Sequence, residues 1–97
     1  MTTEPDTVDA AVALLSAVAH PVRLSTLLAL ADGDERCAGE LQDLAGIEQS
    51  AMSHQLRVLR ENRLVVTERR GRHVWYRVAD EHVANLVRDA LAHSRHG

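Results

Sequence analysis

The sequence predicts a single, mainly α-helical domain that carries one β-hairpin near its C-terminal end. A chain of 97 residues fits one compact domain. Apolar residues recur at helical spacing along most of it, whereas β-branched and aromatic residues gather in residues 64–78. The chain has no Phe, and its aromatic residues are Trp75 and Tyr76. The core must therefore consist mainly of Leu, Val, Ala and Met, which suit helices.

The first two helices are marked by their boundaries. Residues 1–6 are polar and are expected to form a disordered tail, so the folded domain is expected to span residues 7–97. The first helix is predicted to begin at Thr7 and to end before His20-Pro21, which places proline at the first position of the second helix. Asp32-Gly33-Asp34 is predicted to end that second helix.

Two shorter helices are predicted next, over about residues 38–45 and 49–61, with Gly46 ending the first of them. Two short helices joined by a tight turn indicate a helix-turn-helix. The period of the apolar residues then changes. Residues 64–67 and 73–78 are predicted to be the strands of a hairpin with a glycine near its turn.

A last helix is predicted after the hairpin, with Asp80 as its N-cap. Four helices, a hairpin and a final helix follow the order of a winged helix-turn-helix. A single domain of this size buries a modest core, and pairing with a second copy would add buried area. We expect a homodimer that pairs through the first and last helices.

The charge is unevenly distributed along the chain. The formal net charge of −3, taken alone, argues against a nucleic-acid partner. However, seven of the eleven Arg lie in residues 57–77 against two Glu, so this segment carries +5, and the chain has no Lys. A basic segment inside an acidic chain predicts a directed nucleic-acid-binding surface.

Cysteine usage and hydropathy bear on the compartment. Cys37 is the only cysteine, so no intramolecular disulfide can form, and a reducing compartment is consistent with this. No apolar run approaches the roughly 20 residues of a membrane span, and residues 1–5 lack the features of a signal peptide. A cytoplasmic location, without membrane contact, is expected.

Polar residues on the fourth predicted helix and arginines at the hairpin suit a DNA groove. Four polar side chains recur at three- and four-residue spacing opposite the apolar face: Ser50, Ser53, His54 and Arg57. Small side chains allow close approach to the major groove, and Arg binds guanine edges or phosphates. Three arginines flank the predicted turn and could reach the DNA backbone or minor groove: Arg69, Arg70 and Arg72. The pattern alone leaves open a solvated helix face followed by a charged turn.

The last predicted helix carries four good ligands for borderline divalent ions: Asp80, His82, His93 and His96. His93 and His96 share a helix face, whereas His82 and His93 are separated by about 16 Å along the axis, too far for one ion to bridge. Two such helices running antiparallel across a two-fold axis would bring Asp80 and His82 of one chain to the histidine pair of the other. The spacing alone leaves open that these are unrelated solvated residues.

Three segments resemble the ArsR/SmtB family of metal-sensing repressors: His20-Pro21-Val22-Arg23-Leu24, residues 48–60 and Val74-Trp75-Tyr76-Arg77-Val78. The resemblance covers nearly the whole chain from about residue 10 onward. It implies that Gln49, Ser50, Ser53 and His54 face DNA, with Arg57 as a neighbour. It also implies that Asp80, His82, His93 and His96 form the C-terminal-helix metal site of the zinc, cobalt and nickel sensors.

The function that the resemblance implies is repression of a two-fold operator in double-stranded DNA by the metal-free homodimer, with release on metal binding and control of metal-efflux genes. Three imidazoles and one carboxylate make a tetrahedral set that suits Zn(II) first, then Co(II), with Ni(II) also open. Four protein ligands leave no position for a substrate, so neither enzymatic activity nor a small-molecule substrate is expected. Cys37 alone cannot form the family's Cys-x-Cys site, which argues against arsenic, cadmium or lead sensing.

Two alternatives remain at this point. The protein could be a winged-helix repressor governed by a non-metal inducer or a protein partner, with the histidines incidental. It could also be a metal-storage or metal-transfer protein that does not bind DNA, although the arginine-rich hairpin and the small polar helix face argue against this.

Overall fold

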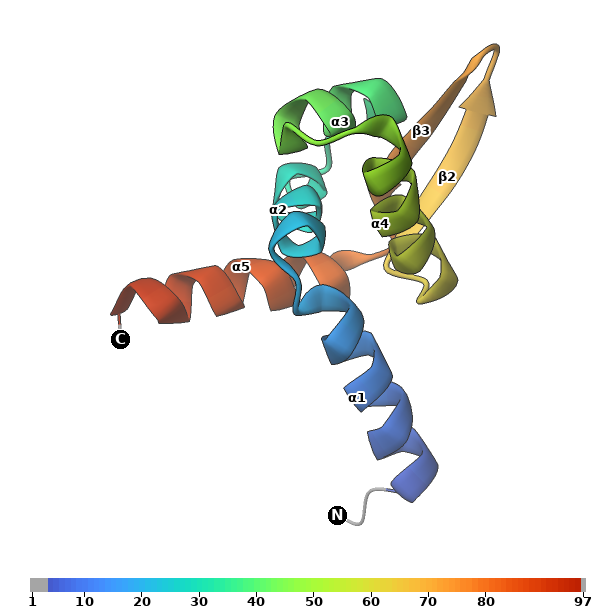
Figure 1. The fold of residues 1–97 in the computed structure, drawn as a ribbon. Helices are drawn as coiled ribbons and strands as arrows, with labels where there is room; N and C mark the ends of the chain where they lie inside the picture. The colour runs from blue at the N-terminus through green and yellow to red at the C-terminus, as the bar shows by residue number, and fades with distance from the viewer. Residues whose placement is uncertain (1–3, 97) are drawn as a thin grey trace.

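The structure is a computed structural model that describes residues 4–95 in full and the backbone of His96. The elements follow in the order α1 (Pro5–Val18), α2 (Pro21–Leu30), β1 (Arg36–Cys37), α3 (Ala38–Ala45), α4 (Gln49–Glu61), β2 (Val65–Arg70), β3 (His73–Val78) and α5 (Glu81–His96) (Figure 1). The predicted mainly helical fold with a hairpin is confirmed. The bounds of α3 and α4 are those expected from the sequence.

The sheet has a third strand that the sequence analysis did not predict. Its strand order is β1-β3-β2, and both neighbours pair antiparallel to β3. Strand β1 has two residues, with Arg36 opposite Tyr76 and Cys37 opposite Trp75. A two-residue strand is too short to show alternation, so only the pairing with β3 defines it.

The hairpin strand β2 runs further than predicted. It begins at Val65 and continues past Thr67 to Arg70, which pairs with His73. The added residues are charged and have weak strand preference, so the sequence alone did not predict them as strand. Pairing with β3 holds their backbone in the extended conformation. The turn has two residues, and Gly71 at its first position has φ +62°, as a type II′ turn requires.

Helix α1 begins at Pro5, two residues before the predicted start at Thr7, so residues 5–6 of the expected disordered tail are helical. Pro at the first helical position and Asp6 in the first turn both favour a helix start, the first through its fixed φ and the second through the helix dipole. Residues 1–3 of that predicted tail lie outside the described part of the chain.

Helix α4 ends without a glycine. Arg63 has φ +58°, the left-handed conformation that usually selects glycine. The backbone N–H of Leu64 donates to the carbonyl of Leu59 (3.0 Å), and the N–H of Arg63 donates to that of Arg60 (3.1 Å), which together form a Schellman motif. Leu59 and Leu64 are both fully buried and anchor this end of the helix in the core.

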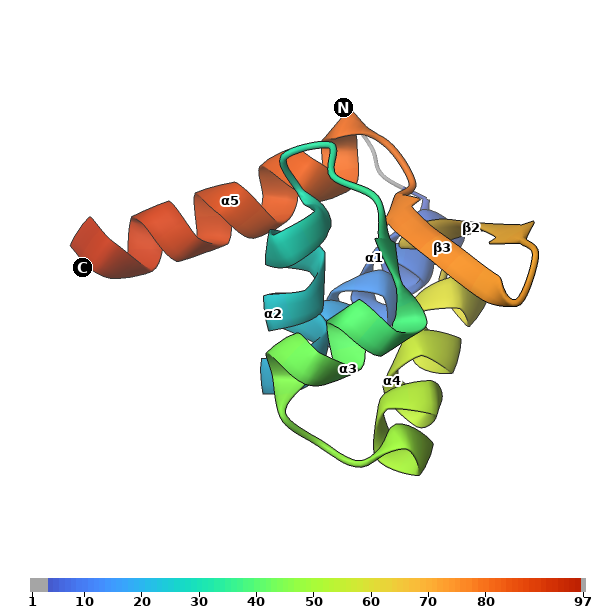
Figure 2. The ribbon, with the colours of Figure 1, turned by 90° about the horizontal axis from the view of Figure 1, so that it is seen from above.

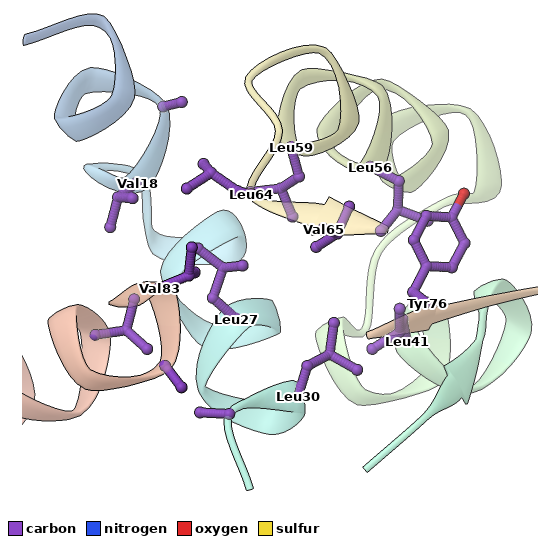
Figure 3. Close-up of a cluster of buried hydrophobic side chains, with 14 of the residues drawn as sticks. Val18, Leu27, Leu30, Leu41, Leu56, Leu59, Leu64, Val65, Tyr76 and Val83 are labelled. Atoms are coloured by element: carbon purple, nitrogen blue, oxygen red, sulfur yellow. The ribbon is translucent and has the colours of Figure 1, made fainter. Parts of the chain in front are cut away.

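The core lies where α2, α4, α5 and the base of the hairpin meet (Figure 3). Helix α2 supplies Leu27 and Leu30, which have no exposed surface. Val83 packs the first turn of α5 against α2, and Tyr76 of β3 borders the core on the side of the sheet. The apolar face of α4 is therefore buried, which turns its polar face outward.

Two helices extend from this core as arms. Figures 1 and 2 show the free end of α5 pointing away from the hairpin, while α1 leaves the domain in another direction. On α1 three large apolar side chains at i, i+4 and i+7 are exposed: Val8 (46%), Val12 (55%) and Leu15 (50%). Within the described part of one chain, this apolar face is therefore left largely exposed.

Within residues 4–96, no single helix has both the length and the apolar content of a membrane span. Taken together, α1 and α2 would meet these criteria by length and composition, but they bend by 92° at the break between them.

Candidate nucleic-acid interface and metal ligands

The structure brings the predicted DNA-facing residues of α4 onto one open surface. The side chains of Gln49, Ser50, Ser53, His54 and Arg57 are all exposed. Four of them, all except Gln49, line an open groove of about 470 Å³ between α4 and the sheet. Gln49 and Ser53 line a second groove toward α3. Short hydroxyls at the start of α4 leave room for a nucleic-acid edge to approach the helix.

Two polar residues of this groove were not among the site residues predicted from the sequence. Arg60 lies one turn beyond Arg57, and Tyr76 of β3 forms part of the wall. The three-residue spacing from Arg57 could have identified Arg60. Tyr76 could not have been found in this way, because only the packing of the sheet against α4 places it there.

Two neighbouring side chains contact Arg57 on the exposed face of α4. The guanidinium Nη2 of Arg57 lies 3.1 Å from Nδ1 of His54. Its Nε lies 3.9 Å from Oε1 of Glu61, one turn further along α4. These contacts are exposed and weak, so Arg57 can reorient toward a phosphate or a base edge.

The three arginines of the hairpin tip differ in their surroundings. Nη2 of Arg70 lies 2.6 Å from Oε2 of Glu68 and 2.7 Å from Oε2 of Glu35, and its guanidinium stacks over Trp75 at 5.5 Å from the ring centroid. Among residues 4–96, no ion pair or side-chain hydrogen bond engages the guanidinium of Arg69 or of Arg72. These two charges are therefore available to a phosphate, whereas that of Arg70 is already neutralised.

The ion pair at the hairpin also shifts the pKa of both groups. The hydrogen bond from Arg70, and then its charge, lower the pKa of Glu68 below its ordinary value. The same hydrogen bond with Glu68 raises the pKa of Arg70. The pair thus keeps both charges over the whole neutral range.

The predicted metal ligands are spread along α5. Oδ1 of Asp80 accepts a hydrogen bond from the N–H of Val83 at 3.0 Å, which confirms Asp80 as the helix N-cap. His82 follows at the base of α5, and His93 lies near the free end; both are exposed. His96 lies in the last turn, and its side chain is outside the described part of the structure. In the described residues of one chain, no three such donors come together.

A helix-turn-helix with an exposed polar second helix, flanked by a basic β-hairpin, defines a winged helix-turn-helix, a fold of DNA-binding transcriptional regulators. The sequence profile described as "Bacterial regulatory protein, arsR family" matches residues 20–67. The chain belongs to the arsR family, whose members are DNA-binding regulators of transcription rather than enzymes.

Two relatives come from Mycobacterium tuberculosis. The HTH-type transcriptional regulator NmtR is 48% identical over 82 residues, which cover 84% of this chain and 68% of NmtR. The HTH-type transcriptional repressor SmtB is 44% identical over 86 residues, which cover 89% of this chain and 63% of SmtB. The chain therefore spans less than two thirds of the length of SmtB.

A solved structure supports the fold independently. The homodimeric winged helix-turn-helix DNA-binding domain Mb0332 from Mycobacterium bovis superposes with a TM-score of 0.83 at 27% identity. The match covers 98% of this chain and 91% of that domain.

Proposed function

We propose that this protein is a metal-responsive transcriptional repressor. Its metal-free homodimer binds a two-fold operator and releases it on binding Zn(II), or alternatively Co(II) or Ni(II), and so controls metal-efflux genes. The layout of α5 carries the proposal. Asp80 and His82 lie at its base and His93 lies about 16 Å further along, so these donors can share an ion only across two chains.

The exposed face of α1 supports a homodimer. Val8, Val12 and Leu15 form an apolar stripe along a helix that projects from the domain. A second copy would remove this stripe from water and bring the α5 helices together. The homodimeric state of the M. bovis domain is consistent with this arrangement.

The donor set fits a tetrahedral borderline ion. Asp80 uses Oδ1 to cap α5, which leaves its other carboxylate oxygen for an ion. His82 and His93 are exposed, and among the described residues neither has a hydrogen-bond partner. Together with His96 they supply three imidazoles and one carboxylate, a set that suits zinc. When bound, the ion would cross-link the two α5 helices.

DNA binding would use residues of both protomers. Gln49, Ser50, Ser53 and His54 would read base edges in the major groove, while Arg57, Arg69 and Arg72 would bind phosphates. Arg70, which pairs with Glu35 and Glu68, would instead hold the wing in place. Linking the α5 helices favours a dimer geometry that fits the operator poorly. A coupling of a few kcal/mol suffices, and DNA then weakens metal binding by the same factor.

The test is a fluorescence-anisotropy titration. The probe is the duplex that the metal-free protein selects from a random DNA library. We expect stoichiometric zinc to weaken binding by about tenfold or more. If the affinity for DNA is unchanged with zinc, cobalt and nickel, the proposed metal response is excluded. The absorption spectrum of the cobalt-loaded protein then separates a four-coordinate from a six-coordinate site.

Variants on α5 separate the metal site from the fold. His93→Ala combined with His96→Ala should keep DNA binding and lose the metal response. Asp89→Asn is the matched control, because Asp89 is exposed and lies one turn before His93 on the same face. A loss of response in Asp89→Asn would assign the carboxylate ligand to Asp89 in place of Asp80.

Two other results would redirect the proposal. DNA binding without tight metal in equilibrium dialysis would indicate a repressor with another inducer or a protein partner. Tight metal without DNA binding in a gel shift would indicate storage or transfer of metal.

A further inference from the structure

Among the described residues, helix α1 is anchored to the domain near its C-terminal end. Ala17 and Val18 in its last turn are buried, and the partly buried Leu14, one turn earlier, also packs against the core. The rest of the helix projects from the domain as an arm (Figure 1). The direction of the arm is therefore set by the contacts of its last two turns.

The carbonyl groups at the end of α1 need partners from outside the helix. Two of them accept N–H groups of the short connection to α2. The other two are held by Arg23 of α2: its Nε donates to the carbonyl of Ala17 at 2.5 Å, and its Nη2 donates to that of Ser16 at 3.5 Å. The last four carbonyls of α1 are thus all satisfied, two of them by one side chain.

The same guanidinium also reaches the recognition helix. Nη1 of Arg23 donates to Oε1 of Gln55 on α4 at 2.7 Å. Gln55 directly follows His54, one of the residues on the DNA-facing surface, and is itself partly buried. A single side chain therefore ties the end of the arm to the helix that reads DNA.

Arginine is suited to this task, and lysine is not. A guanidinium offers donors in a fixed planar fork, so it can hold two carbonyls of α1 and one amide of α4 at the same time. An ammonium is a compact point charge that lacks this reach. Among residues 4–96 no carboxylate pairs with Arg23. Because its guanidinium contacts carbonyls at the C-terminal end of α1, its charge faces the negative end of the α1 dipole.

We propose that Arg23 is a positioning residue that fixes the angle between α1 and α4. In the homodimer, and on the basis of the proposed function, this angle sets the spacing of the two recognition helices. If Arg23 merely capped α1, the contact with Gln55 would not matter for that angle.

A distance measurement within one protomer tests the angle directly. Spin labels are placed at Ala10→Cys and Glu61→Cys in a Cys37→Ser background, and labelled chains are diluted with unlabelled protein. Ala10 and Glu61 are exposed, whereas Cys37 is partly buried. We expect a single narrow α1–α4 distance in the parent and a shifted or broadened one in Arg23→Lys. An unchanged distribution in Arg23→Lys overturns the proposal.

Two further variants keep this test specific. Gln55→Leu removes only the acceptor on α4 and should broaden the distance as Arg23→Lys does, with no further change in the double variant. Asn62→Ala is the control, because Asn62 caps α4 by donating from Nδ2 to the carbonyl of Val58 and, among the described residues, forms no side-chain hydrogen bond with another helix. Broadening in Asn62→Ala alone would assign the effect to fraying of α4. Circular dichroism verifies that each variant is folded.

DNA affinity provides the second readout. Arg23→Lys should weaken binding to a duplex with two selected half-sites by about tenfold, because two tethered contacts need a matched spacing. Binding to a single half-site should change much less. An equal loss on both duplexes would place the effect on one recognition helix and overturn the spacing role. The distance measurement needs neither DNA nor metal, so it decides the angle even if the proposed function fails.

Discussion

Arg70 of β2 and Glu35, which precedes β1, form an ion pair with Nη2 and Oε2 2.7 Å apart. The two residues are 35 positions apart, and their pair ties the tip of the wing to the body of the domain. Glu68 shares the same guanidinium. The wing is therefore held by one arginine, whereas within residues 4–96 no ion pair or side-chain hydrogen bond engages the guanidinium of the two others, Arg69 and Arg72.

This difference predicts unequal salt dependence of DNA binding. Arg72→Ala should lower the slope of log affinity against log salt by about 1 per protomer, because a free guanidinium releases a counterion from each phosphate it binds. Arg70→Ala should change the slope less, since its charge is already balanced. Anisotropy titrations at several salt concentrations measure both slopes. Arg95→Ala, on the free end of α5, is the control; an equal drop for Arg70→Ala would contradict this assignment.

The wing should loosen in acid. The lowered pKa of Glu68 means that its contribution is complete above the ordinary carboxyl pKa of 4.5 and is lost as the pH falls through the lower folded value. Trp75 is the only tryptophan and stacks on Arg70, so its fluorescence reports on this contact. We expect an acid transition below pH 4.5 in the native protein. Glu68→Gln should reduce the transition; an identical curve would show that another group causes it.

Asp80 has two roles that substitution can separate. Asp80→Asn keeps an oxygen that can accept from the N–H of Val83 and should fold like the native protein, but it removes the anionic metal ligand. Asp80→Ala loses the cap as well and should be destabilised by about 1 kcal/mol. Urea unfolding at fixed protein concentration measures the loss of the helix cap. Zinc competition with a chromophoric chelator measures the loss of the metal ligand. Equal zinc affinity in Asp80→Asn and the native protein would exclude Asp80 as a ligand.

Two glycines of the helix-turn-helix should respond in opposite directions to alanine. Both have open space where a Cβ would lie. Gly46 ends α3 with φ +67°, so Gly46→Ala should cost about 1 kcal/mol in backbone strain. Gly39 lies inside α3, so Gly39→Ala should stabilise the protein by about 0.5–1 kcal/mol. Thermal unfolding measures both, and stabilisation by Gly46→Ala would contradict the left-handed turn.

Local patterns in the sequence determined much of this protein. Periodic apolar residues and stop signals such as Gly46 gave the bounds of α3 and α4, and the cap at Asp80 was readable from its position, because each depends on neighbours within one or two turns. The polar face of α4 was predicted for the same reason.

Tertiary structure alone decided the rest. The strand β1, the grip of Arg23 on Gln55 and the pair of Arg70 with Glu35 all join residues that are far apart in the chain. No local period encodes such contacts, because they arise only when packing brings two distant surfaces together. The wing arginines looked alike in sequence, and only folding separated the one that holds the wing from those left free.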